Sequence, residues 1–121
     1  MRRDMTLVRR ILKTVNESPG PVGIDQLVND ADGREKVGEH IRLMREAGLV
    51  EARILAADGD PFYSATITRL TWEGHDYLAA VGASDVWRTV QEEGARAGLE
   101  LTLDTAKALA AKAIERKLGL D

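Results

Sequence analysis

The chain contains no cysteine, which excludes disulfide bonds and thiolate metal sites. Its two histidines, His40 and His75, lack the close spacing of a metal-binding pair, so we expect no metal and no cofactor. No apolar run approaches the roughly 18 residues that a membrane helix needs. The start, "MRRDMTLVRR", lacks the continuous apolar segment of a secretion signal. We therefore expect a cytoplasmic protein without membrane association.

Recognisable catalytic groups are also missing. No serine stands in the setting of an activated nucleophile, and "PGPVG" lacks the lysine of a phosphate-binding loop. Glu92 and Glu93 are adjacent in an expected helix and point apart, so they do not form a carboxylate pair. Aromatic residues make up 4% of the chain, too few for a surface that stacks bases. We expect that the protein is not an enzyme.

The charge of the chain is negative overall but unevenly distributed. A formal net charge of −3 at pH 7 is unlike that of a strongly basic nucleic-acid binder. Residues 1–15 nevertheless contain one acid, Asp4, and five basic residues, which are Arg2, Arg3, Arg9, Arg10 and Lys13. A local basic patch of this kind can contact phosphates despite an unfavourable total charge.

Apolar spacing predicts three helices in the first part of the chain. Residues 5–15 carry apolar side chains at helical spacing, and Asp4 can cap this helix. Proline and glycine in "ESPGPVG" end it, and "IDQLVND" then gives a short second helix. A third helix, over residues 34–47, is expected to begin in a capping box of Asp32 and Glu35 and to end at Gly48.

Two β-rich runs follow, "LVEARILAA" and "FYSATITRL", and the turn signal "DGDP" between them predicts a hairpin. Three more helices are expected after the hairpin. Thr71 can cap the first, "WEGHDYLAAV", and Thr102 can cap the last, "LDTAKALAAKAIERKL". Three helices followed by a hairpin and another helix is the element order of a winged helix-turn-helix domain. We predict a mostly helical chain with a small β-hairpin: a winged helix domain in residues 1–82 and a C-terminal helical extension in residues 83–121.

Several blocks of the sequence resemble a bacterial and prophage family known as domain of unknown function 2513. The blocks are "MRRDMTLVRRIL", "HIRLMREAGLV", "RLTWEGHDYL", the pair "VW" and the closing "KLGL". The resemblance covers nearly the whole chain, although "VGASDVW" is less charged than its counterpart in relatives. It implies a winged-helix-like fold and a bacterial or phage setting, and it supplies neither an activity nor catalytic residues.

The leading hypothesis for function is binding of double-stranded DNA, as a small bacterial or prophage transcriptional regulator. The third helix would enter the major groove, the N-terminal arm would hold the backbone, and the wing would support both. The candidate DNA-binding residues are Arg2, Arg3, Arg34, Lys36, His40, Arg42, Arg53 and Arg69. Two of these assignments have plain alternatives: the arm can be a solvated terminus, and His40 can be a packed side chain.

Acidic side chains oppose this hypothesis. Glu35, Glu39 and Glu46 fall on the expected outward face of the third helix, and Asp58 and Asp60 lie at the wing tip. These charges would repel a phosphate backbone. The alternative is that the same fold serves as a protein-interaction module, for example a phage protein that docks on a basic surface of a host factor.

The last helix has an apolar stripe rich in alanine, which permits close approach of another helix. The stripe consists of Leu103, Ala106, Ala110, Ala113 and Ile114. It can form a homodimer interface, or it can pack on the chain's own domain, and the sequence leaves both open.

Overall fold

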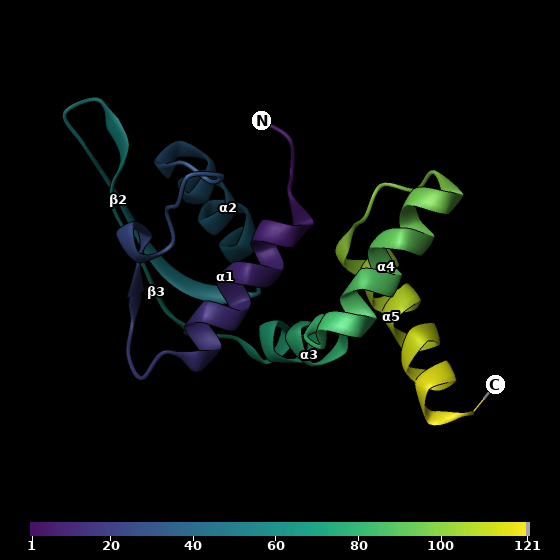
Figure 1. The fold of residues 1–121 in the computed structure, drawn as a ribbon. Helices are drawn as coiled ribbons and strands as arrows, with labels where there is room; N and C mark the ends of the chain where they lie inside the picture. Colours follow the sequence, from purple (N-terminus) through teal and green to yellow (C-terminus); the bar gives the residue numbers. More distant parts are fainter. Residues whose placement is uncertain (121) are drawn as a thin grey trace. The chain divides into compact units, whose positions relative to one another are not determined.

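The computed structural model describes residues 1–120, which form helices and one small antiparallel sheet (Figure 1). The elements are α1 (Met5–Glu17), β1 (Val22–Gly23), a 3-10 turn η1 (Ile24–Gln26), α2 (Arg34–Glu46), β2 (Val50–Ala57), β3 (Asp60–Leu70), α3 (Trp72–Val81), α4 (Ser84–Ala97) and α5 (Leu103–Leu118). The predicted mostly helical chain with a β-hairpin is confirmed. No helix among the described residues is long and apolar enough to cross a membrane.

Two compact units make up the chain, Met1–His75 and Asp76–Asp121. The boundary therefore lies inside α3, earlier than the predicted division after residue 82. The first turn of α3 belongs to the N-terminal unit because it is held at the junction of α2 and β2.

Thr71 and Gly74 make the contacts at that junction. The Thr71 amide donates to the Leu49 carbonyl at 3.0 Å, and the Thr71 hydroxyl donates to the carbonyl of Gly48. The same hydroxyl oxygen caps α3 as predicted, by accepting from the Gly74 amide at 3.1 Å. A Cβ atom at Gly74 would lie 2.0 Å from the Leu49 carbonyl oxygen, so the close approach of α3 requires glycine here.

Helix α1 forms as predicted. Asp4 is its N-cap, and the Asp4 Oδ1 atom accepts from the amides of Thr6 at 3.0 Å and Leu7 at 3.1 Å. The apolar stripe of α1 enters the core of the N-terminal unit. Its buried residues are Met5, Leu7, Val8, Ile11, Leu12 and Val15.

The predicted second helix is reduced to the single turn η1. Asn29 interrupts it, because its side-chain oxygen accepts from the amides of Ala31 at 3.0 Å and Asp32 at 2.7 Å. The predicted capping box of Asp32 and Glu35 is wrong. Gly33 is the N-cap of α2, and the Asp32 carboxylate binds two cations instead.

The sheet has the order β1-β3-β2, with both pairings antiparallel. The hairpin was predicted, whereas β1 was not, because two residues carry no detectable alternation. The hairpin turn uses left-handed backbone at Asp58, with φ of 51°, and at Gly59, with φ of 79°. Aspartate and glycine are suited to that conformation, which explains the "DG" signal.

The C-terminal unit contains the pair of helices α4 and α5, which pack against each other. Gly98 ends α4 in the left-handed conformation, with φ of 68°. Thr102 caps α5 as predicted, and the Thr102 hydroxyl oxygen accepts from the Thr105 amide at 3.1 Å.

Gly74→Ala should destabilise the chain by roughly 1–3 kcal/mol, because the added methyl group collides with a backbone carbonyl that cannot rotate away. Urea unfolding followed by circular dichroism measures the change in the free energy of unfolding. Gly20→Ala is the matched control, since a Cβ atom there meets nothing within 4 Å. Equal stability of the two variants would contradict the proposed role of Gly74.

Candidate functional site

Arg34, the first residue of α2, joins three segments of the N-terminal unit. Its Nη1 atom pairs with the carboxylate of Asp25 in η1. Its Nη2 atom donates to the backbone carbonyls of Phe62 at 2.6 Å and Tyr63 at 3.1 Å in β3. The guanidinium predicted to meet DNA therefore fixes the hairpin to the start of α2.

The ring of Phe62 is seated on the same side of α2. A Cβ atom at Gly38 would lie 2.4 Å from the Phe62 Cγ atom, so the missing side chain makes the room that the ring occupies. Arg42 covers the ring, with the guanidinium carbon 4.8 Å from its centroid, and also pairs with Glu39 at 3.1 Å. Arg34, Gly38 and Arg42 are spaced four residues apart and form one stripe, which we call the hairpin seat.

Lys36 lies on a different stripe and joins α1 to the loop before α2. Its ammonium group is 2.9 Å from the Asp4 Oδ2 atom and 2.8 Å from the Asp32 Oδ1 atom. Asp32 is buried, and its other oxygen accepts from Arg10 at 3.1 Å. Lys36, which was expected to meet DNA, thus sits between two carboxylates of its own chain.

The ion pairs shift the protonation of these groups. The hydrogen bond from Lys36, helped by Arg10 and opposed by burial, lowers the pKa of Asp32 below its ordinary value. Burial alone would raise the pKa of Asp4, but Lys36 and the amides of Leu7 and Thr6 together lower it. Hydrogen bonds to Asp32 and Asp4 raise the pKa of Lys36, so all three groups are charged at neutral pH.

His40 lies in the core, with 0% of its surface exposed. The backbone amide of Asp4 donates to its Nε2 atom at 2.8 Å, and its Nδ1 atom is 2.8 Å from the carbonyl oxygen of Lys36. This burial removes His40 from any direct contact with DNA and matches the packed alternative.

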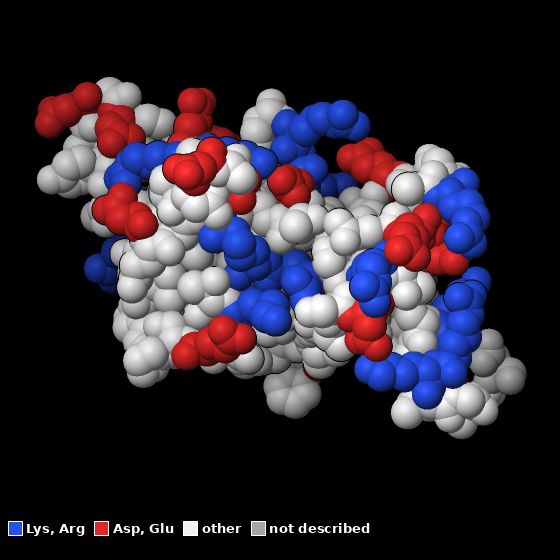
Figure 2. Space-filling model, in the orientation of Figure 1, with Lys and Arg blue, Asp and Glu red and all other residues white. Residues whose placement is uncertain are grey.

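The solvent-facing part of α2 is acidic. Three of its four cations make the internal contacts described above, and the fourth, Arg45, is exposed. Glu35 and Glu46 are also exposed, and Glu39 is half-buried. Acidic side chains also gather at the tip of the hairpin (Figure 2). We use the name acidic face for Glu35, Glu39 and Glu46 of α2 together with Asp58 and Asp60 at the hairpin tip.

The remaining predicted DNA contacts are dispersed. Arg69 forms two hydrogen bonds with Glu51, at 3.0 and 2.6 Å, so its charge is balanced on the sheet. Arg53, Arg2 and Arg3 are exposed. Basic side chains lie over α1 in Figure 2, on a different surface from the hairpin tip.

The apolar stripe of α5 is occupied within the chain. Ala106 and Ala110 have 0% exposure, and α4 is the helix on which α5 packs. These two alanines are therefore not available to a second copy, which corrects their assignment to a dimer interface. Leu103, Ala113 and Ile114 are half-buried on the same helix.

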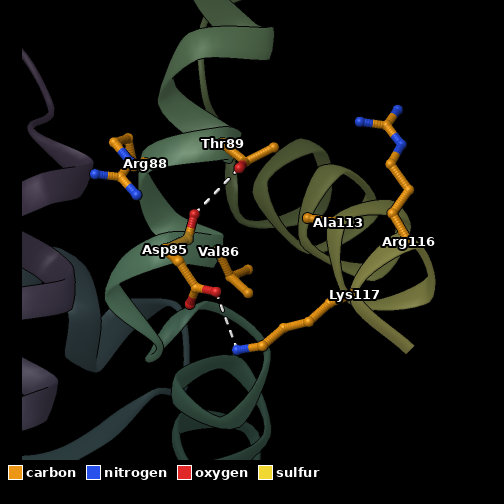
Figure 3. A pocket seen from close by; sticks show the side chains of 7 residues that line it. All are labelled: Asp85, Val86, Arg88, Thr89, Ala113, Arg116 and Lys117. Atoms are coloured by element: carbon orange, nitrogen blue, oxygen red, sulfur yellow. Dashed lines mark hydrogen bonds and ion pairs between the residues drawn. The ribbon is translucent and has the colours of Figure 1, made fainter. Parts of the chain in front are cut away.

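An ion pair joins the start of α4 to the last turn of α5. Lys117 reaches from α5 to within 3.0 Å of Asp85 at the start of α4, beside a hollow of about 360 Å³ (Figure 3). The hydrogen bond from Lys117 lowers the pKa of Asp85. Arg88 and Arg116 also line the hollow, but their guanidinium groups point in different directions in Figure 3, so the cations do not converge on one point.

Sequence reasoning missed the partners that hold the predicted cations. Phe62 looked like an ordinary strand residue, and Gly38 looked like an unremarkable helix position. The partner ring lies 24 positions beyond Gly38 in the sequence, which local periodicity does not reach.

The chain belongs to the family described as "Hypothetical protein (DUF2513)", whose model matches residues 2–100. It is also similar to a protein of Haemophilus influenzae described as "Uncharacterized protein". The two are 29% identical over 122 residues, which span 98% of this chain and 100% of that protein. No solved structure matches the chain significantly. The resemblance seen in the sequence is confirmed, and the family description assigns no activity.

Gly38→Ala should unseat Phe62 and destabilise the chain by roughly 1–3 kcal/mol, since the new methyl group would overlap the ring. Phe62→Leu in the same background should recover part of the loss, because the smaller side chain leaves space for the methyl group. Urea unfolding measures both effects. Additive losses in the double variant would show that the two positions do not share this contact.

Asp32→Asn should lower stability at neutral pH, and its deficit should shrink in acid. Because the pKa of Asp32 is lowered by folding, its carboxylate stabilises the fold above the unfolded-state value. That contribution is lost as the pH falls below about 4 and through the folded-state value. Unfolding midpoints of wild type and variant at several pH values test this. The exposed Asp30→Asn is the control, and a deficit that stays constant in acid would rule out the ion-pair explanation.

Proposed function

We propose that residues 1–75 form a winged-helix domain. The order α1, β1, η1, α2, β2, β3 supports this, with α2 in the place of the recognition helix and the hairpin in the place of the wing. The sheet order β1-β3-β2 supports it further, because the short strand after the first helix pairs with the second strand of the hairpin. The turn η1 replaces the usual second helix.

We propose that this domain is a protein-interaction module that binds a basic partner through its acidic face. One observation carries the proposal: Arg34, Lys36 and Arg42 are bound within the chain, and they leave an acidic exposed side on α2. A groove-reading helix needs free donors on that side, and a phosphate backbone would meet carboxylates there.

Apolar groups beside the carboxylates suit a protein partner. Tyr63 is 62% exposed and Leu55 is 52% exposed, and both lie on the hairpin. The backbone carbonyl of Tyr63 binds Arg34 at the start of α2, while its side chain points to the opposite side of the strand from Phe62. Exposed aromatic side chains with nearby charge are typical of protein interfaces, where the charges also select the partner.

Binding of DNA by a small transcriptional regulator is the second candidate function. It rests on the exposed Arg2, Arg3 and Arg53 and on the basic side chains over α1 in Figure 2. In that case the phosphate backbone would meet the arm and α1 rather than the outward side of α2. Either function suits a cytoplasmic protein, which is the location we propose.

The double variant Glu35→Gln/Glu46→Gln separates the two functions. Binding to a labelled lysine-rich amphipathic peptide should weaken several-fold, because two attractive charges are lost, whereas any binding to a random-sequence duplex should strengthen. Fluorescence anisotropy at low and near-physiological salt measures both affinities. Glu92→Gln, an exposed change in the C-terminal unit, is the control.

Two outcomes would count against the protein-interaction proposal. One is peptide binding that is absent or unchanged in the double variant. The other is wild-type binding to the duplex that falls steeply with salt, which is the behaviour of a protein that displaces counterions from phosphates. The second outcome would favour the DNA-binding candidate.

A further inference from the structure

Strand β2 is one edge of the sheet, and no strand among residues 1–120 pairs with its outer side. Pairing with β3 leaves every second amide and carbonyl group of β2 directed outward. Natural proteins often protect such an edge with proline, lysine or an extra residue in the strand. β2 contains neither proline nor lysine, and at the irregularity beside Glu51 the extra residue is Thr68 of β3. The outer edge of β2 is therefore continuous and can accept another strand.

Two side chains of opposite charge flank Ala52 on this edge. Glu51 and Arg53 are exposed, and they lie on the same side of the strand because side chains alternate along it. Glu51 binds Arg69 of the neighbouring strand, whereas Arg53 makes no ion pair with any residue in the range 1–120. We propose that β2 pairs antiparallel with β2 of a second copy of the chain, with the two-fold axis at Ala52.

The charges select this register over its neighbours. In a symmetric antiparallel pair, one residue lies on the axis opposite its own copy, and the residues on either side of it face each other. With the axis at Ala52, Glu51 of each copy faces Arg53 of the other. An axis at Glu51 or at Arg53 would place like charges directly opposite, which destabilises a strand pair. An axis at Ile54 would place Arg53 opposite Leu55 and leave the charges without partners.

The other side of the strand favours the same register. Val50, Ala52 and Ile54 share this side, where Val50 is 2% exposed and the other two are half-buried. With the axis at Ala52, Val50 faces Ile54 of the second copy, and Ala52 faces its own copy. The apolar row then continues from one sheet into the next, and the half-buried side chains lose further contact with water, which stabilises the pair.

The contact is short, so we expect a weak dimer. The chain turns from α2 into β2 through left-handed backbone at Gly48, with φ of 76°, and the pairing is therefore confined to residues 50–54 of each copy. A contact of this size lies below the area of permanent dimers, which places the dissociation constant between micromolar and millimolar concentration. The inference rests on neither proposed function, because residues 50–54 lie outside the acidic face. It does engage Arg53, which dimerisation would withdraw from DNA.

Sedimentation equilibrium of the full chain, from micromolar to millimolar concentration, tests the dimer. Glu51→Lys and Arg53→Glu each place like charges opposite one another, and each should raise the dissociation constant at least roughly fivefold. An equal mixture of these two variants should recover dimers, because the basic edge of one faces the acidic edge of the other. The double variant, which exchanges the two charges, should recover dimers by itself. Lys112→Glu, an exposed change in α5, is the control for net charge.

A crosslink tests the register. The chain has no cysteine, so Ala52→Cys introduces one thiol per copy. Directly opposite residues have Cα atoms roughly 4.5–5.5 Å apart, which suits a disulfide, and oxidation should therefore link the two copies. Ala56→Cys, exposed on the same strand, is the control and should link far less.

Three results would overturn the proposal. The first is a wild-type chain that stays monomeric at millimolar concentration. The second is a dimer whose dissociation constant is unchanged in both single charge variants, which would place the interface elsewhere, for example on α5. The third is equal crosslinking at positions 52 and 56, which would show an edge that associates without a fixed register.

Discussion

The N-terminal unit depends on the ammonium group of Lys36 in α2, which binds two carboxylates from different segments of the chain. Asp4 brings the start of α1 to it, and Asp32 brings the loop that leads into α2. Removing any one of these three charged groups should destabilise the fold, because the remaining groups are then partly desolvated without a partner. The arrangement also explains why α2 starts at Arg34: the carboxylate that could have capped the helix is held by Lys36 and Arg10.

The polar side chains of α2 are therefore structural before they are functional. The hairpin seat holds Phe62 on one stripe, while Lys36 and His40 hold the start of α1 on another. Arg34, Lys36 and Arg42 could contact a DNA groove only by breaking the contacts that hold the hairpin or the N-terminal arm in place. The fold class alone does not carry the function, and the charges that remain outside decide what the surface attracts.

Local patterns in the sequence were enough for much of the fold. The helical spacing and cap of α1, the "DG" turn and the capping of α5 each depend on residues close in the chain, and these predictions are confirmed. The candidate site was harder, because the partner of Arg10 lies 22 residues away and the carbonyl that binds Arg34 lies 28 residues away. A helical projection shows which side chains share a face, but not which face another segment covers. DNA binding, protein binding and a dimer remain predictions.

The fit of Phe62 against Gly38 also constrains how this family can vary. The Phe62 ring occupies the space that a side chain at position 38 would need. A larger residue at 38 would therefore collide with the ring, and a smaller residue at 62 would leave a void. Aligned relatives that keep this hairpin geometry should carry either a large residue at 62 with glycine at 38, or a smaller residue at 62 with a side chain at 38. Such reciprocal variation would arise from packing in every member, whatever partner each one has come to bind.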